Sequence, residues 1–294
     1  MEEKDFPGLY QASDAASMQA QKNYKNIIAY DLVSMIVASA LAIYNYQETE
    51  PKLLVYIISG VLLLISFTLT LVIRIKKFED IWYQGRALAE SCKTLTWRFI
   101  ICAESFEVNI EKDNVKEKFI ARLREFSNEF KELNDSLNAK TIVLPIITDK
   151  MWEVRNLNTL ERKDFYIKNR INDQKDWYAT KAEFNKKKYS SWFLVIIISQ
   201  LIAILSIAYL IKFPETNLNL VGFFTTISAS ALSWLQLKQH QELKQAYTTA
   251  AQELNFIQAS FGTVNSDLEL AEFVLDSENA ISREHTLWQA QKRK

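Results

Sequence analysis

Apolar residues are concentrated in long segments of the chain, and charged residues fill the stretches between them. Residues 53–73 contain no charged side chain, and about twenty such residues form a helix that crosses a bilayer core near 30 Å thick. Similar segments recur, so that the full set is residues 27–44, 53–73, 192–211 and 218–237. Pro51 and Pro214 lie in the short turns within the two pairs. The pattern predicts an all-α integral membrane protein with four transmembrane helices in two hairpins.

Basic residues mark the outer ends of both predicted hairpins, whereas the short turns contain few of them. The flanking residues are Lys22, Lys25, Arg74, Lys76, Lys77, Lys186, Lys187, Lys188, Lys238 and Lys244. By the positive-inside rule, both termini and the middle region are then cytoplasmic. The predicted parts are an N-terminal cytoplasmic helix (1–26), a transmembrane hairpin (27–75), a cytoplasmic helical region (76–189), a second hairpin (190–237) and C-terminal cytoplasmic helices (238–294).

The polar regions are predicted to form a helical bundle, because their apolar residues recur at alternating spacings of four and three. The middle region shows this spacing in Ile81, Gly85, Leu88, Cys92, Leu95, Phe99, Cys102 and Phe106, and again in Phe119, Leu123, Phe126, Phe130, Leu133 and Leu137. Such faces need partners, which are either one another or neighbouring subunits of a homo-oligomer. Residues 141–147 are expected to form a turn that packs on the bundle. A helix capped near Thr148 is expected to continue into the third apolar segment.

The two halves of the chain share one plan, which suggests an approximate duplication. In each half a basic flank precedes a hairpin, and a second basic flank and an amphipathic helix follow it. The tail repeats the helical spacing through Leu243, Tyr247, Ala250, Leu254, Ile257 and Phe261.

The composition narrows the possible partners and compartments. The 294 residues include 35 basic and 35 acidic side chains, and this balance gives no reason to expect DNA or RNA as a partner. Five glycines and four prolines are few for this length, which favours long helices. The two cysteines, Cys92 and Cys102, lie too far apart in one predicted helix to form a disulfide, which fits a reducing cytosol.

Residues that could carry out catalysis are scarce. The two histidines, His240 and His285, do not have the spacing that places two metal ligands on one helix face. The scattered glycines cannot build a phosphate-binding loop. We therefore expect no catalytic residues, no metal site, no cofactor and no enzymatic activity.

Polar residues in the apolar segments allow two interpretations. Thr226, Ser230 and Ser233 lie on one face of the fourth segment, where small hydroxylated residues either pack helices closely or line a water-filled path. Asp31 lies about one turn inside the first segment. It is either an interfacial carboxylate or part of a ring that attracts cations at a pore entrance.

Two clusters in the middle region combine aromatic and basic side chains. The candidate ligand contacts in them are Arg86, Arg98, Arg170, Trp177 and Tyr178. Aromatic rings that stack on bases, beside guanidinium groups that hold phosphates, would suit a nucleotide. The alternative is that the aromatic residues pack the bundle and the charges pair on its surface.

The same clusters carry a family resemblance. The motifs Trp82-Tyr83-x-x-Arg86-Ala87-x-Ala89-Glu90-Ser91 and Arg170-x-x-Asp173-Gln174-x-x-Trp177-Tyr178-x-x-Lys181 are similar to those of SLATT-like effector proteins of bacteria. Residues 241–254, with Tyr247 and Leu254, form a third such block. Four spans in two pairs around a helical middle most resemble the SMODS-associating four-transmembrane effectors.

The resemblance implies a role in anti-phage defence of the CBASS type. A cyclic oligonucleotide would activate the protein, which would oligomerise and permeabilise the bacterial inner membrane. The residues themselves leave two other classes open. One is a membrane-anchored scaffold or adaptor that opens no pore, and the other is a small ion channel that conducts without a signal.

Overall fold

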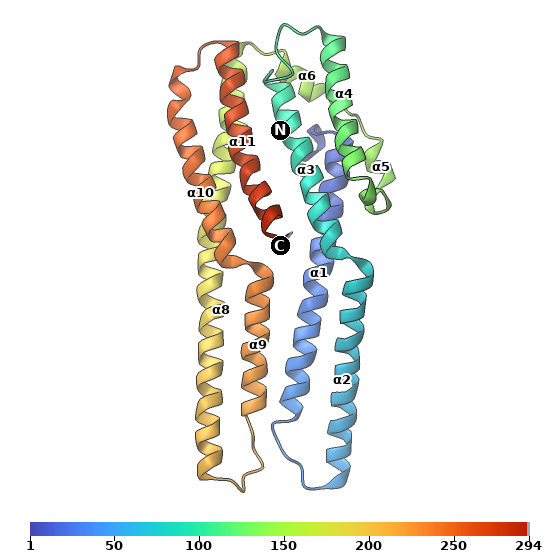
Figure 1. Cartoon of the computed structure of the whole chain (residues 1–294), viewed down its shortest axis with the longest axis vertical. Helices are drawn as coiled ribbons and strands as arrows, with labels where there is room; N and C mark the ends of the chain where they lie inside the picture. The colour runs from blue at the N-terminus through green and yellow to red at the C-terminus, as the bar shows by residue number, and fades with distance from the viewer. Residues whose placement is uncertain (293–294) are drawn as a thin grey trace. The chain divides into compact units, whose positions relative to one another are not determined.

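The structure is a computed structural model that describes the backbone of residues 1–292 and the side chains of residues 1–262 and 264–282. The side chain of His285 lies outside the described residues. Within the described range the chain consists of helices and turns without a β-strand, apart from one isolated bridge between Tyr44 and Leu218 (Figure 1). The predicted all-α class is therefore confirmed.

The first half of the chain contains two long helices followed by shorter ones. Their order is α1 (Gly8–Leu41), α2 (Thr49–Lys76), α3 (Phe78–Ile100), α4 (Lys112–Glu129), α5 (Ala139–Ile142) and α6 (Asp149–Arg155). The second half contains α7 (Thr159–Tyr166), α8 (Asp173–Lys212), α9 (Val221–Lys238), α10 (His240–Ala259) and α11 (Asp267–Lys292). A π-helical segment, Ile167–Asn172, joins α7 to α8 without a break.

The chain forms two compact units. The first, which we call the bundle, consists of residues 1–21, 79–182 and 245–294. The second, which we call the span unit, consists of residues 22–78 and 183–244. Helices α1 and α8 each contribute one part to the bundle and the other part to the span unit.

The two halves repeat one arrangement of helices. A long helix (α1 or α8) leads through a turn into a second one (α2 or α9), and a single left-handed residue separates that helix from the next. The left-handed residues are Lys77, with φ 47°, and Gln239, with φ 48°. A non-glycine residue in this conformation stops an α-helix and redirects the chain. The duplication suggested by the sequence pattern thus has a counterpart in the backbone.

The core of the bundle is rich in aromatic rings. Phe99 packs against Phe106, Phe119 and Trp152, with ring centroids 4.6–5.7 Å apart. The predicted apolar spacing supplies this core, since nearly all of its members from Gly85 to Phe119 are buried. The middle-region seam is therefore confirmed as an internal packing face.

Close approach of α1 and α3 in the bundle depends on Gly85. A Cβ atom on this residue would lie 3.1 Å from the carbonyl oxygen and 3.1 Å from the Cβ atom of two α1 serines, Ser13 and Ser17 respectively. The Ser17 hydroxyl also donates a hydrogen bond of 2.9 Å to the Trp82 carbonyl oxygen. Glycine thus lets two backbones approach at this crossing.

Two local expectations need correction. Thr148 caps a helix as predicted, but that helix is the short α6, which ends at Arg155 instead of continuing into the third apolar segment. Asn158 then caps α7, which starts the continuous run into α8. Residues 141–147 form the end of α5 and a turn, and Gly8 N donates to the Pro145 carbonyl oxygen over 3.3 Å. Val143 in this turn is nevertheless 81% exposed.

The two hairpins of the span unit are joined at their turns. Asn45 N donates to the Asn217 carbonyl oxygen over 2.8 Å, and Asn219 N donates to the Ile43 carbonyl oxygen over 2.7 Å. The Gln47 side chain adds a bond of 2.7 Å to Asn217 Oδ1. These bonds satisfy backbone groups that would otherwise be left without partners where the helices end.

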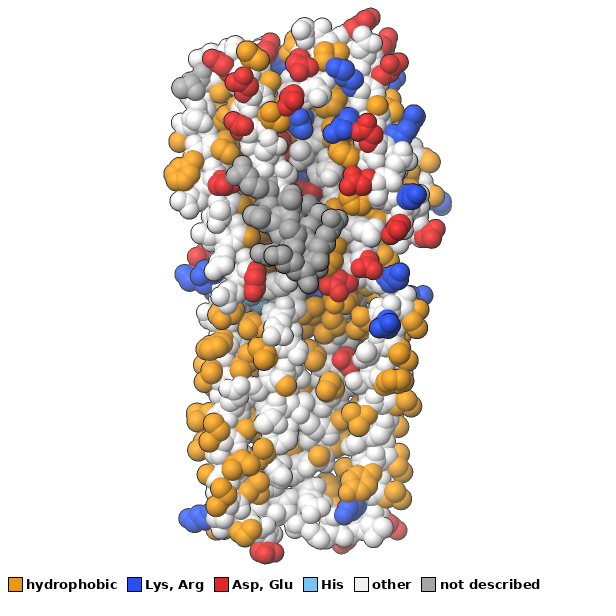
Figure 2. Space-filling view, in the orientation of Figure 1, with side chains coloured by type: hydrophobic (Ala, Val, Ile, Leu, Met, Phe, Trp, Pro, Cys, Tyr) orange, Lys and Arg blue, Asp and Glu red, His pale blue; other side chains and the backbone are white. Residues whose placement is uncertain are grey.

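Small and hydroxylated residues form the buried side of α8 and α9 in the span unit. They include Ser199, Ala203 and Ser206 of α8 and Ser228, Ser230 and Ala231 of α9, and the larger Asn185 and Ile196 of α8 are buried beside them. Such residues let helices pack closely where burial of larger side chains is not the driving force. The outward side of the span unit is apolar by contrast. Figure 2 shows hydrophobic side chains over the span helices and charged ones over the bundle.

Three helices are long and apolar enough to cross a membrane, and their apolar parts lie in the span unit. They are α1, the run that contains α2, and the run that contains α8. The expected fourth span is not confirmed. Helix α9 has only 18 residues, which makes it shorter than the others, and Gln236 and Lys238 are among them.

Candidate functional site

A buried ion pair lies at the centre of the bundle. Arg170, from the π-helical segment, donates from Nε to Glu278 Oε1 over 2.8 Å and from Nη2 to Oε2 over 2.7 Å. Both side chains are 1% exposed. A two-pronged pair of this kind is geometrically specific and stronger than bonds between neutral groups. The pair links α11 to the start of α8 within the bundle.

Two hydroxyl groups complete the surroundings of Glu278. The Tyr166 hydroxyl donates to Oε1 and the Thr94 hydroxyl donates to Oε2, each over 2.9 Å. Burial raises the pKa of Tyr166, and the negative charge of Glu278 adds to this shift. Burial alone would lower the pKa of Arg170, but the Glu278 carboxylate raises it overall. Both oxygens of Glu278 are thus fully engaged, and Arg170 is held in its charged form.

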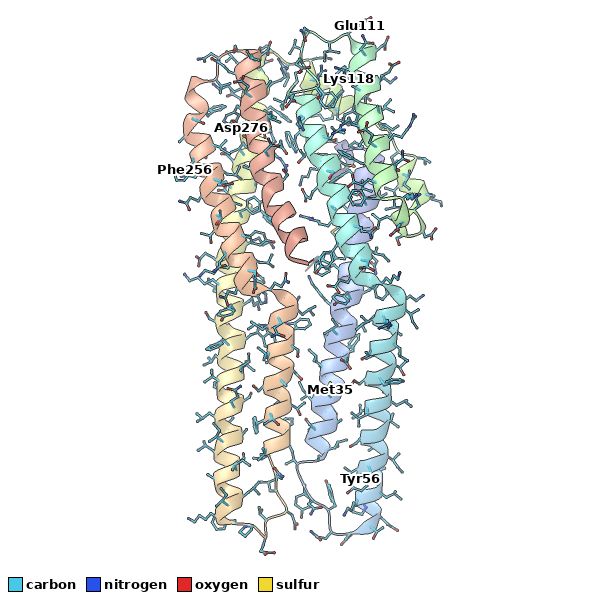
Figure 3. The ribbon with its side chains drawn as sticks, viewed as in Figure 1. Met35, Tyr56, Glu111, Lys118, Phe256 and Asp276 are labelled. Carbon is cyan, nitrogen blue, oxygen red and sulfur yellow. The ribbon has the colours of Figure 1, made fainter. Side chains whose placement is uncertain are left out.

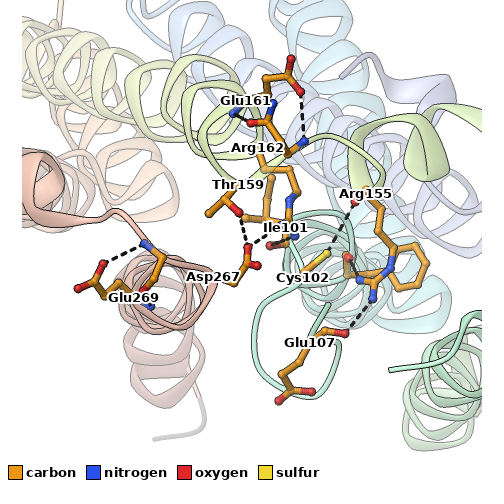
Figure 4. A network of polar contacts seen from close by, with 12 residues as sticks. Ile101, Cys102, Glu107, Arg155, Thr159, Glu161, Arg162, Asp267 and Glu269 are labelled. Carbon is orange, nitrogen blue, oxygen red and sulfur yellow. Dashed lines mark hydrogen bonds and ion pairs between the residues drawn. The ribbon is translucent and has the colours of Figure 1, made fainter. Parts of the chain in front are cut away.

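Buried cations also hold the C-terminal end of α3 (Figure 4). Arg155 donates from Nη1 to the Phe99 carbonyl oxygen over 2.6 Å. Arg162 donates to the Ile101 carbonyl oxygen over 3.3 Å and to Asp267 Oδ1 over 2.7 Å. The last carbonyl groups of a helix lack partners within it and carry partial negative charge, so that guanidinium groups stabilise this end.

This network has the properties of a structural junction. It joins α3, α6, α7 and the start of α11, and its cations bind carbonyl oxygens of the chain itself. Burial raises the pKa of the Cys102 thiol, which keeps it protonated and unreactive. Among the described residues no group of three or more His, Cys, Asp or Glu side chains could hold a metal ion.

The three arginines predicted to contact a ligand each bind an acidic residue of the chain. Arg86 lies 2.7 Å from Glu90 and 3.7 Å from Asp14. Arg98 lies 3.5 Å from Glu104, and Arg170 holds Glu278 as described above. A ligand phosphate at any of these sites would have to displace the carboxylate. Their role as ligand contacts stays a prediction.

The predicted aromatic contacts lie together on α8. Trp177 and Tyr178 have ring centroids 5.2 Å apart, and both pack against Tyr247 of α10. Tyr178 is 3% exposed and Trp177 is 37% exposed. Trp177 is therefore exposed, Tyr247 is half-buried, and Lys181 Nζ lies 5.8 Å from the centre of the Trp177 ring.

A groove on the bundle offers a more open combination of aromatic and basic groups. It lies between α4 and the stretch from Pro145 to Trp152, and its volume is about 610 Å³. Its lining residues are Lys112, Asp113, Lys116, Ile120, Pro145, Ile146, Ile147 and Trp152. The volume falls in the range of about 300–1,000 Å³ that is usual for small-molecule sites.

The chemistry of the groove matches a ligand with both an aromatic ring and a phosphate. The Lys112 ammonium lies 4.9 Å from the centre of the Trp152 ring. Lys116 is one turn along the same helix face, so both ammonium groups can reach one anion beside that ring. Sequence reasoning missed this site, because its two walls are separated in the chain. A Lys-x-x-x-Lys pair at the start of an expected helix was the available signal.

The polar residues predicted in the spans have different surroundings. The Ser66 hydroxyl of α2 donates to the Asp31 carboxyl group of α1, so the acid is partnered within the first hairpin. On α9, Thr226 donates back to the Gly222 carbonyl oxygen over 2.8 Å. Ser230 is buried, whereas Ser233 is exposed. The three α9 residues thus do not form one uniform surface, and their role in a pore stays a prediction.

Comparison with known families gives two matches that cover most of the chain. A family model described as SMODS and SLOG-associating 2TM effector domain 3 matches residues 7–163. A second one, described as SMODS and SLOG-associating 2TM effector domain 1, matches residues 166–288. No curated protein and no solved structure matches the chain. The division between the two matches falls in the last turn of α7, shortly before the repeated arrangement of helices begins again.

Proposed function

The chain belongs to the SMODS and SLOG-associating 2TM effectors, and we propose that a cyclic oligonucleotide activates it to permeabilise the bacterial inner membrane. The family supports the broader part of this statement, a membrane effector role associated with anti-phage systems. Activation and permeabilisation are the finer parts that we add. Together they describe abortive infection, in which the cell dies before the phage matures.

The observation that carries the membrane role is the surface of α2. None of its residues is buried, and large apolar side chains are exposed over most of its surface. Tyr56, labelled in Figure 3, is 62% exposed. A helix that is apolar all round is stable only where lipid or protein surrounds it. We propose that lipid covers part of α2 and that a second copy of the chain covers another part in a homo-oligomer.

The groove supports a nucleotide as the activating ligand. A base would stack beside Trp152, and Lys112 and Lys116 would bind its phosphate. The Asp113 carboxylate could accept a hydrogen bond from an amino group of the base. To bind a ligand, Arg170 would have to leave its two bonds to Glu278, whereas the groove residues would not have to leave partners held as tightly. Placing the ligand in the groove therefore requires less rearrangement than placing it at Arg170.

Activation requires two arrangements of the helices with different affinities for the ligand. A ligand that binds both equally would shift nothing, however tightly it bound. We propose that the occupied groove favours an arrangement in which the spans of neighbouring subunits enclose water. The termini and the bundle are cytoplasmic in this proposal, because basic residues flank the outer ends of the hairpins.

Dye release from vesicles tests the proposal. The purified protein would be reconstituted into vesicles that contain a self-quenching dye, and candidate cyclic oligonucleotides would be added outside. We expect release that depends on the ligand. Replacing both groove lysines (K112Q with K116Q) should weaken the response roughly tenfold per lysine. Lys118→Gln is the matched control, since Lys118 lies on the same helix outside the groove (Figure 3).

The outcomes separate the parts of the proposal. No release with any cyclic oligonucleotide would contradict activation by this class of ligand. If the double groove variant still released dye in response to the ligand, the proposed function would stand, but the ligand would bind at another site. Release without any ligand would favour the constitutive channel.

One observation favours a scaffold as the second candidate. The turn after α5 exposes Val143 (81%), Leu144 (40%) and Ile146 (46%) close together in the chain. Clustered apolar residues on a protein surface often mark protein contacts. A scaffold would lose partner recruitment on replacement of Val143 with Asp, and it would release no dye under any condition.

A further inference from the structure

A buried histidine of the span unit lies among basic residues from several helices. His240 is the first residue of α10 and is 6% exposed. Its Nδ1 atom lies 2.7 Å from Asn185 Oδ1 on α8, and its ring faces Phe184 edge-on with centroids 6.5 Å apart. If Nδ1–H donates this bond, Nε2 is the nitrogen that can take up a further proton.

Three lysines act on this ring from three helices. They are Lys25 of α1, Lys188 of α8 and Lys238 of α9. Burial lowers the pKa of His240, and the positive charges of Lys238, Lys188 and Lys25 lower it further. Lys238 precedes His240 by two residues, and Lys188 lies over the Phe184 ring that faces His240. We call the three lysines the lysine cluster.

Two members of the lysine cluster, Lys188 and Lys238, lie over aromatic rings. Lys188 Nζ lies 5.7 Å from the centre of the Phe184 ring, and Lys238 Nζ lies 4.7 Å from the centre of the Trp234 ring. Neither takes part in an ion pair among the residues that the structure describes. The like charges of Lys188 and Lys238 therefore repel each other.

We propose that the lysine cluster and His240 bind a phosphate group, and that an anionic phospholipid supplies it. Ammonium groups and a protonated imidazole all donate to phosphate oxygens. Lys25 precedes the first apolar segment by two residues, Lys188 precedes the third by four, and Lys238 ends α9. Lipid headgroups lie at such ends of apolar segments. A soluble phosphate offers the same oxygen acceptors, but it has no apolar chains that could contact the apolar segments beside the site.

The bound lipid would connect the two hairpins. Lys25 belongs to the first hairpin, and the other two lysines belong to the second. One phosphate that contacts lysines of both hairpins would attract them to the same group. This role does not depend on a cyclic oligonucleotide or on a pore.

Thermal unfolding in neutral detergent tests the site with three additives. The protein would be heated with phosphatidylglycerol, phosphatidylcholine or inorganic phosphate at equal concentration. We expect phosphatidylglycerol to raise Tm and the other two to leave it unchanged. Near a membrane surface each lysine contributes about 1 kcal/mol to binding of anionic lipid, which is roughly fivefold in affinity. The pair of changes K188Q and K238Q should then weaken the effect about 25-fold.

The control variant is Lys212→Gln. Lys212 lies at the turn end of α8, and its Nζ lies 5.3 Å from the Phe213 ring, a contact similar to that of Lys238 with Trp234. The Tm shift should survive in this variant. An equal loss in both variants would show general surface attraction and overturn the site. An equal Tm rise with inorganic phosphate would overturn the assignment to lipid.

The imidazole itself gives a second readout that does not depend on stability. With His285 replaced by Gln, the one remaining histidine is His240, and NMR can follow its titration. Phosphatidylglycerol should raise the pKa of His240, because an anion opposes the effect of the lysines. The same pKa in phosphatidylglycerol and phosphatidylcholine would contradict the proposal.

Discussion

Arg170 in the bundle and the lysine cluster in the span unit both place positive charge beside aromatic rings. Arg170 lies 5.8 Å from the Trp97 ring and holds Glu278 with two bonds, at 1% exposure of either side chain. Lys188 and Lys238 lie over rings as well, but without a carboxylate in the described ion pairs. The buried cation of the bundle thus has its counter-charge within the chain, whereas we propose that lipid supplies the counter-charge of Lys188 and Lys238.

The two units also differ in how closely their helices pack. A Cβ atom on Gly85 of the bundle would lie within 3.1 Å of α1 atoms, a tight contact, whereas one on Gly60 of α2 would meet no atom within 4 Å. The helices of the bundle thus approach closely at Gly85, while Gly60 lies on an open side of α2. From this difference we expect that substitutions inside the bundle change the stability of the protein in detergent. The stability of the span unit should instead depend on added lipid. Four predictions test it, from the largest expected effect to the smallest.

Replacing Glu278 with Gln should have the largest effect. The change keeps the volume of the side chain but leaves Arg170 charged and buried without a counter-charge. Removing one partner of a buried pair costs about 3–5 kcal/mol in the free energy of unfolding. Chemical denaturation in detergent, followed by circular dichroism, would measure this loss.

The control is Asp276→Asn on the same helix (Figure 3). Asp276 is exposed, so its replacement should change the free energy of unfolding by no more than about 0.5 kcal/mol. If E278Q and D276N lost the same amount, the buried pair would not be what holds the bundle.

Replacing Gly85 and Gly60 with Val compares the packing of the two units. At Gly85 the added side chain would meet Ser13 and Ser17, and overpacking of this kind costs about 1–3 kcal/mol. At Gly60 the side chain enters open space, and we expect a change within about 0.5 kcal/mol. Denaturation of both variants in one detergent gives the comparison. A large loss at Gly60 would mean that α2 is covered by protein there.

The sequence predicted what local spacing controls. Leu88, Cys92, Leu95 and Phe99 are buried because apolar residues four and three apart share one face of a helix. The apolar surface of α2 followed from the lack of charge in residues 53–73. Both properties depend on neighbours within a few turns, which a single sequence displays.

Contacts between distant residues could not be predicted in this way. Arg170 was expected to contact a ligand, but its partner Glu278 is 108 positions away, and no local pattern links the two. The groove combines α4 with residues 145–152, whose meeting depends on the short helices between them. The fourth span looked apolar enough by its first residues, while the structure ends α9 after 18 residues with Lys238 included.

A smaller effect is expected for Ser66→Ala in the first hairpin. Ser66 of α2 donates to the Asp31 carboxyl group of α1, and loss of a hydrogen bond to an acid costs about 1–2 kcal/mol. Ser34→Ala is the matched control, because Ser34 donates only to the Tyr30 carbonyl oxygen of its own helix. Thermal unfolding in detergent should rank S66A below S34A. Equal values would show that water already serves the carboxyl group.

The smallest effect concerns the pH dependence that His240 gives to the span unit. Burial and the lysine cluster lower the pKa of His240 below its ordinary value near 6.5, so the unfolded chain takes up a proton at a higher pH than the folded one. The contribution to stability is therefore complete above about pH 6.5 and is lost as the pH falls through the folded pKa.

Between pH 7.5 and 6, Tm should fall slightly in neutral detergent and should stay level in His240→Gln. The decline should persist in His285→Gln. Because an anion beside the lysines raises the pKa of His240, phosphatidylglycerol should also flatten the profile. The Arg170–Glu278 pair has no counterpart to this response, since its charge is balanced within the chain. A profile that lipid and His240→Gln both leave unchanged would remove the contrast between the two units.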